Sequence, residues 1–179
     1  MHETIELPEH HEGHGDNPFT LPVTVTISIL AVLVAAVTLL GHRAHTEELL
    51  LQSKATDQWA YFQAKNIRMH EMETMVDVLD TVGLQDKEKA KAVREKYEKE
   101  VERYKDDKTE IGNEAKSLEG ERDLISRRAD RFDGGEALLE IGLVICSITL
   151  LTRRKLFWVT GMLIGAAGVL VAVTGFFAH

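Results

Sequence analysis

The feature that most constrains this chain is an apolar run at positions 21–40 that contains no charged residue. A helix needs about 20 such residues to cross the hydrocarbon core of a membrane. We therefore predict a membrane-spanning helix over residues 20–41. A cleaved signal peptide would begin with basic residues, whereas the segment before this run contains no Lys or Arg. The span is thus expected to be retained.

A second apolar block near the end of the sequence is interrupted by Arg153, Arg154 and Lys155. Three cations are costly in lipid, so the block divides into two further spans. We predict spans over residues 134–152 and 156–177, joined by a basic turn at 153–155.

The segment between the first and second spans, residues 42–133, is rich in charge and follows a heptad pattern. Two sets of positions each advance by an average of 3.5 residues, which is the spacing of a coiled-coil seam. The first set is Leu51, Ala55, Trp59, Phe62, Asn66, Met69, Met72, Val76 and Leu79. The second set is Ala90, Val93, Tyr97, Val101, Tyr104, Lys108, Ile111, Ala115, Leu118, Arg122, Ile125, Ala129 and Phe132.

A turn near residues 82–86, around Gly83, separates the two sets, because glycine readily ends a helix. A connection this short makes the two helices antiparallel neighbours. We expect Asn66 to face the region of Arg103, and Leu51 that of Leu118. The predicted fold is all-α: three transmembrane helices, with a long antiparallel coiled-coil hairpin between the first two.

An isolated two-helix hairpin buries little surface, so oligomerisation is the expected completion of this fold. Gly161 and Gly165 also form a small-xxx-small motif, which allows close helix packing either between copies or against the chain's own spans. The candidate interface residues are Trp59, Phe62, Asn66, Met69, Tyr97, Tyr104, Lys108, Arg122, Gly161, Gly165 and Gly168.

Two further groups of residues could form a proton-transfer site or a metal site. Glu140 is an acid about one turn inside the second span; it is interpreted as lying near the interface, rather than in a proton relay. His10, His11 and His14 could hold a metal, but they lie in the acidic tail of residues 1–19, whose glycines and prolines favour a flexible segment. We therefore predict no metal site and no cofactor.

The remaining composition excludes several classes of protein. A formal net charge of −8 argues against a nucleic-acid partner, which requires a basic face. The single cysteine, Cys146, permits no internal disulfide. No nucleophile-base arrangement, phosphate loop or dinucleotide turn is recognisable, so we predict that the protein is not an enzyme.

The basic turn at 153–155 also bears on orientation, because short basic loops favour the cytoplasmic side. Arg43 and the arginines at 122–131 favour the opposite orientation, but they flank a loop too long for this rule to be reliable. We expect a multi-pass protein of the cell (inner) membrane with its hairpin on the non-cytoplasmic side.

The run from Ala55 to Arg68, ATDQWAYFQAKNIR, resembles the signature of a bacterial membrane family catalogued as domain of unknown function 4337. Asp57, Trp59, Gln63 and Arg68 belong together to this pattern. The resemblance implies the same layout of one span, a helical segment and a basic-turn hairpin of two spans. It implies no activity, and the stretch rich in Lys and Glu before Thr109 departs from it.

The expected function is that of a homo-oligomeric structural membrane protein that contacts lipid and other helices without catalysis. One alternative is an accessory subunit of a larger membrane complex, packed against other membrane proteins. A second alternative is an oligomeric channel, with the hydroxyl groups of the first span facing water. These hydroxyl groups belong to Thr24, Thr26, Ser28 and Thr38.

Overall fold

The computed structural model describes residues 19–82 and 87–177, and three helices make up nearly all of this part of the chain. Helix α1 is Thr20–Val82, α2 is Lys87–Thr152 and α3 is Lys155–Gly175. The described residues contain no β-strand, which confirms the all-α prediction. The predicted turn near 82–86 falls between α1 and α2, and residues 83–86 lie outside the described part.

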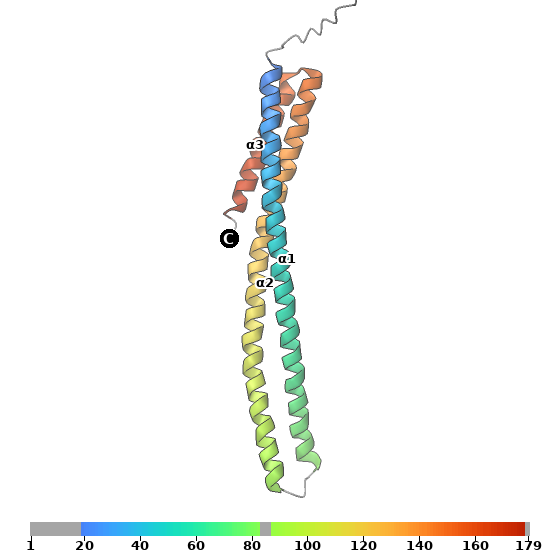
Figure 1. Cartoon of the computed structure of the whole chain (residues 1–179), viewed down its shortest axis with the longest axis vertical. Coiled ribbons are helices and arrows are strands. Elements are labelled where there is room, and N and C mark those ends of the chain that lie inside the picture. Colours follow the sequence, from blue (N-terminus) through green and yellow to red (C-terminus); the bar gives the residue numbers. More distant parts are fainter. Residues whose placement is uncertain (1–18, 83–86, 178–179) are drawn as a thin grey trace, which may run out of the picture.

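Helices α1 and α2 lie side by side and antiparallel over their whole length, while α3 packs only on the end opposite to the α1–α2 connection (Figure 1). We call the three-helix end the apolar bundle, formed by residues 20–41, 134–152 and 155–175. The two-helix remainder, residues 42–82 and 87–133, is the stalk. All three helices contain a stretch long and apolar enough to cross a membrane.

Neither α1 nor α2 is interrupted where the apolar bundle meets the stalk. At 1.5 Å per residue, the 63 residues of α1 form a rod about 95 Å long. The predicted boundaries at 41/42 and 133/134 are therefore changes of composition within continuous helices. Gly41 lies inside α1 and is buried against α2. A Cβ at this position would lie only 3.3 Å from Asp133 Oδ1, so glycine suits the close contact between the two helices.

Buried side chains recur every seven residues through the apolar bundle and into the stalk. Leu30, Val37 and Ala44 of α1 pack in one cluster with Phe132, Leu139 and Cys146 of α2, among other residues. A repeat of seven keeps the same face of each helix toward its neighbour. A seven-residue repeat of buried side chains thus runs from the apolar bundle into the adjoining part of the stalk.

Aromatic pairs mark both ends of the apolar bundle. Phe19 and Trp158 meet edge-to-face at one end with ring centroids 5.6 Å apart, and Phe132 and Phe176 do so at the other at 5.4 Å. The 21 residues of α3 between these ends measure about 31 Å, close to the thickness of a hydrocarbon core. Aromatic rings commonly lie at the boundaries of that core.

The connection between α2 and α3 consists of Arg153 and Arg154, and Lys155 already begins α3. Arg153 has a φ of 54°, the left-handed conformation usually taken by glycine after a helix. Its N–H donates to Thr149 O at 2.8 Å, which closes the last turn of α2. The turn is thus one residue shorter than predicted.

The residues of α2 that contact a given residue of α1 along the stalk lie more than one helical turn from the predicted ones. Asn66 accepts a hydrogen bond at 3.2 Å from Lys108, which lies five positions after the predicted Arg103. Gln52, next to Leu51, bonds Arg122 rather than the region of Leu118. Side chains on a helix lean toward its own N-terminus, so in an antiparallel pair each side chain leans toward higher-numbered residues of the opposite helix.

Candidate functional site

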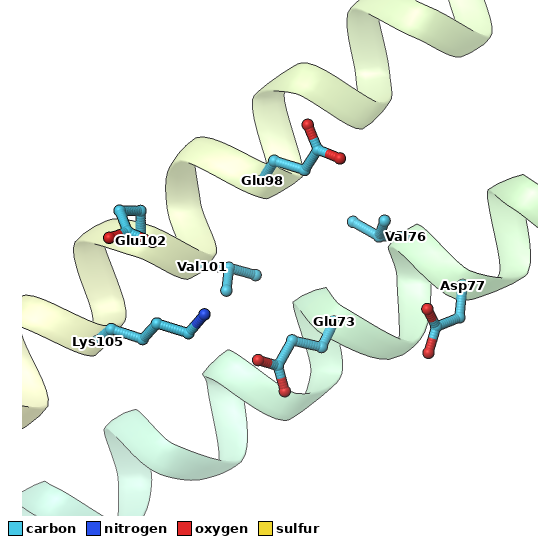
Figure 2. A pocket seen from close by; sticks show the side chains of 7 residues that line it. All are labelled: Glu73, Val76, Asp77, Glu98, Val101, Glu102 and Lys105. Atoms are coloured by element: carbon cyan, nitrogen blue, oxygen red, sulfur yellow. The ribbon is translucent and has the colours of Figure 1, made fainter.

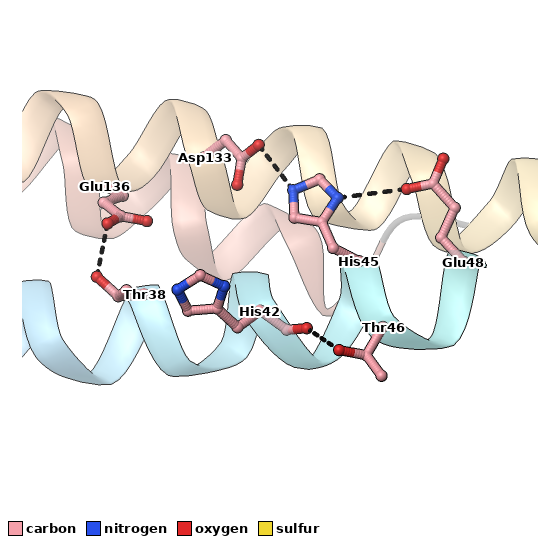
Figure 3. A network of polar contacts seen from close by, with 7 residues as sticks. All are labelled: Thr38, His42, His45, Thr46, Glu48, Asp133 and Glu136. Carbon is pink, nitrogen blue, oxygen red and sulfur yellow. Dashed lines mark hydrogen bonds and ion pairs between the residues drawn. The ribbon is translucent and has the colours of Figure 1, made fainter. Parts of the chain in front are cut away.

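A polar network ties α1 to α2 where the apolar bundle meets the stalk (Figure 3). Thr38 donates a hydrogen bond to Glu136 at 2.6 Å. Two turns further along α1, His45 lies 3.0 Å from Asp133 and 3.3 Å from Glu48. Thr38 and His45 are seven residues apart and therefore share one face of α1.

The imidazole of His45 faces a carboxylate at each ring nitrogen, Nε2 at Asp133 and Nδ1 at Glu48. Both nitrogens can donate only when the ring is doubly protonated. The hydrogen bond to Asp133 is the main cause that raises the pKa of His45 above its ordinary value, partial burial opposes it, and Glu48 adds to it. The positive charge of His45 is thus stabilised at this junction.

Glycines bring α2 and α3 into backbone contact within the apolar bundle. A Cβ on Gly142 would lie 2.8 Å from Gly161 O and 2.9 Å from Gly165 N. A Cβ on Gly135 would lie 2.9 Å from Gly168 O. Only residues without a side chain allow two helices to approach so closely.

The α3 glycines expected from the sequence are therefore used within the chain. Gly161, Gly165 and Gly168 are buried, and each faces α2 or Leu30 of α1. Of the two alternatives for this ridge, the structure shows packing against the chain's own helices. The partner glycines, Gly135 and Gly142, were missed, although their spacing of seven matches that of Gly161 and Gly168.

In the stalk, side chains from the run Ala55 to Arg68 reach acidic residues of α2. Trp59 Nε1 donates to Glu119 at 2.8 Å, and Lys65 pairs with Asp107 at 2.6 Å. The hydrogen bond with Asp107 is the main cause that raises the pKa of Lys65. This run is thus the part of α1 most strongly tied to α2 by polar contacts.

The polar residues of the predicted stalk interface also have partners within the chain. Lys108 donates to Asn66, and Arg122 donates to Gln52 at 2.6 Å. Arg122 also pairs with its neighbour Asp123. These contacts satisfy the seam without a second copy.

Most of the predicted apolar interface residues lie in the contact between α1 and α2. Met69 and Tyr104 are buried in one small cluster with Val101. Phe62 and Trp59 stack edge-to-face at 5.3 Å and are partly buried. Tyr97 is also partly buried.

The two sides of the stalk differ in chemistry at the same height. One groove is lined by Glu73 and Asp77 of α1 and by Glu98, Glu102 and Lys105 of α2 (Figure 2). The second groove is lined mainly by apolar side chains, including Ile67, Met72, Met75 and Tyr97. In this part of the stalk, one groove is therefore mainly acidic and the other mainly apolar.

The remaining predicted groups are placed as follows. Glu140 is exposed on α2. Within residues 19–82 and 87–177, no three His, Cys, Asp or Glu side chains are placed to hold a metal ion. His10, His11 and His14 lie outside these ranges.

The hydroxyl groups considered for a channel fall into two sets. Thr26 accepts a hydrogen bond from Trp158 at 3.1 Å, and Thr38 donates to Glu136, so both are used inside the chain. Thr24 and Ser28 are exposed, but each donates to a carbonyl one turn earlier in α1.

No curated protein and no solved structure matches this sequence. The model of the family described as Domain of unknown function (DUF4337) matches residues 19–178, which is nearly the whole chain, and the protein therefore belongs to this family.

Proposed function

We propose that this protein is a homo-oligomeric structural membrane protein that acts through helix–helix contacts and carries out no catalysis. The apolar bundle would cross the membrane, and the stalk would extend from it as a coiled-coil surface for assembly. This proposal assigns no cofactor to the chain.

The observation that carries the proposal is the amount of apolar surface that the stalk leaves open. Leu49, Leu50 and Ile67 are 71%, 55% and 57% exposed, and Met75 is 43% exposed. The stalk has only two helices, and its distal cluster contains three buried residues. Exposed apolar side chains beside so thin a core favour contact with further helices.

Molecular mass is the direct test of this proposal. The full chain, purified in mild detergent, should elute as a complex of several copies when light scattering separates protein from detergent mass. An Ile67→Gln variant should shift the complex toward smaller species, because it removes exposed apolar surface. Arg68→Gln, a change at the adjacent exposed residue, is the matched control. A wild-type protein that is only monomeric would refute the proposal.

The runner-up function is an accessory subunit of a larger membrane complex. The apolar groove at Ile67, Met75 and Tyr97 would suit a helix of another protein as well as one from a second copy. Native purification separates the two functions, because stoichiometric recovery of other subunits would favour the runner-up.

The proposed location is the cell (inner) membrane, with the stalk on the non-cytoplasmic side. Glu88 lies near the tip of the stalk and Arg154 lies at the opposite end of the molecule. In a Cys146→Ala background, an impermeant maleimide applied to intact cells should label Glu88→Cys and spare Arg154→Cys. The reverse pattern would invert the proposed orientation.

A further inference from the structure

The apolar bundle is open on one side. Glycines place α3 against one side of α2, whereas Asp133, Glu136 and Glu140 follow each other by three and four residues along another face. Asp133 and Glu136 both bond side chains of α1, namely His45 and Thr38. This face of α2 therefore borders α1 and is not covered by α3.

Glu140 occupies the open side at a depth where a carboxylate is costly. It lies eight residues after Phe132, or about 12 Å inward from the aromatic pair that marks the end of the bundle. Glu140 is exposed, and no described residue forms a hydrogen bond or ion pair with it. Ionisable side chains within a membrane normally face protein or water.

Several neighbours of Glu140 on this side are small, although Val144, one turn further along α2, is a larger exposed residue. Thr38 and His45 point toward this face of α2, so Ala31, seven residues before Thr38, shares their side of α1. Ala35, one turn further along, and Ser147, seven residues after Glu140, are exposed like Ala31. We call Ala31, Ala35, Glu140 and Ser147 the open face. Small residues at such a face let another helix approach closely.

A second copy could cover the open face in two ways. In a head-to-tail arrangement, Glu140 would meet the outer surface of α3. Because Gly142 contacts Gly161 and Gly165, and Gly135 contacts Gly168 and Ala172, Glu140 is level with the exposed residues Leu163, Ala166 and Ala167. None of these three side chains offers a hydrogen-bond donor.

In a two-fold arrangement a residue that lies close to the axis meets its own counterpart, so an axis beside Glu140 would bring the Glu140 carboxyl groups of the two copies together. Two carboxyl groups can form a hydrogen bond when one of them carries a proton. Of the two arrangements, only the two-fold one gives Glu140 a partner.

We propose that two copies of this chain pack in the membrane through the open face around a two-fold axis, with their Glu140 carboxyl groups hydrogen-bonded to each other. The inference rests on the proposed homo-oligomeric function and adds its membrane interface. A larger oligomer could still form through the exposed apolar side chains of the stalk.

Cysteine cross-linking of the full chain in membranes tests this interface. In a Cys146→Ala background, Ala35→Cys and Ser147→Cys should each give cross-linked dimers. Leu163→Cys and Leu170→Cys are the matched controls, because these exposed residues lie on the outer side of α3, and they should remain uncross-linked. Circular dichroism of each variant verifies that its helices are intact.

Substitution of Glu140 tests the hydrogen bond. Glu140→Gln retains a donor and an acceptor and should keep the dimer, whereas Glu140→Leu should weaken dimerisation on the order of tenfold. Equal dimerisation of the Leu and Gln variants would overturn the role of the carboxyl pair.

The outcomes separate this inference from the proposed function. An oligomer that cross-links at Leu163 or Leu170, and not at the open face, would refute the two-fold interface and leave the homo-oligomer standing. A wholly monomeric protein would refute both. Cross-linking of Ala35→Cys to a different protein would replace the second copy by a foreign partner.

Discussion

The apolar bundle and the stalk are made from the same two long helices, yet different contacts hold them together. In the bundle, α2 and α3 approach until backbone meets backbone at Gly142 and Gly161. In the stalk, a thin line of buried side chains such as Met69 is supplemented by polar ties such as Lys65 with Asp107. The backbone contact leaves no room for an added atom, whereas side chains in the two-helix stalk can move when one of them is changed.

The largest expected effect follows from adding a side chain to the backbone contact. Gly142→Leu should destabilise the protein by about 3 kcal/mol or more, because its Cβ already falls within 3 Å of α3 backbone atoms. In the stalk, a Cβ on Gly120 would meet no neighbouring atom within 4 Å, so Gly120→Leu should stabilise by about 0.5–1 kcal/mol through helix propensity. Denaturant titration followed by circular dichroism measures the free energy of unfolding of both variants. Similar changes in the two variants would contradict the proposed difference between the bundle and the stalk.

The next effect is in the core of the stalk. Met69 is 5% exposed, and Met69→Ala should cost about 2 kcal/mol, the low end for such truncations, because the seam can close around the gap. Met75→Ala, at a residue 43% exposed, should change the stability of a single chain by less than about 0.5 kcal/mol. Hydrogen exchange of stalk amides reports this local change. Faster exchange in the bundle would show that the two regions unfold together.

A smaller effect is expected at the turn between α2 and α3. Arg153 adopts a left-handed φ of 54°, so Arg153→Gly should stabilise the bundle by about 1 kcal/mol. Arg154 has an ordinary extended φ of −99° and Arg154→Gly should bring no gain. The thermal midpoints of the two variants make the comparison, and an equal gain would point to removed charge rather than relieved backbone.

The smallest effect concerns the junction between the two regions. Because Asp133 raises the pKa of His45, the tie from His45 stabilises the fold below the ordinary value of 6.5 and is lost as the pH rises through the folded pKa. The side chain is 44% exposed, so we expect only a few tenths of a kcal/mol. NMR titration should place the His45 midpoint above 6.5, and Asp133→Asn should lower it. A midpoint unaffected by this substitution would contradict the assigned cause.

The periodicity of the sequence predicted the helices but did not predict which residues of α1 and α2 contact each other. The apolar runs correctly predicted three helices with stretches apolar enough to cross a membrane, whereas the predicted hairpin helices are continuous with the first two of them. The partner of Asn66 was predicted incorrectly, because the lean of side chains along each helix shifts every contact, and spacing alone does not include it.

The candidate sites show the same limit. The α3 glycines were recognised as a packing surface, but spacing within α3 does not state which helix lies against it. The bond between Thr38 and Glu136 joins residues 98 positions apart, and neither belongs to a recognisable motif. Contacts of this kind depend on the register of two helices, which a single sequence specifies only through the summed fit of many side chains.

Helices α1 and α2 run without interruption from the apolar bundle into the stalk. The two regions therefore move as one rigid rod. A continuous helix transmits tilt and axial rotation along its whole length, since it has no joint at which to absorb them. A change in tilt of about 5° at the bundle would move the end of an arm of roughly 60 Å by about 5 Å. A change in the tilt of the apolar bundle would therefore displace the far end of the stalk.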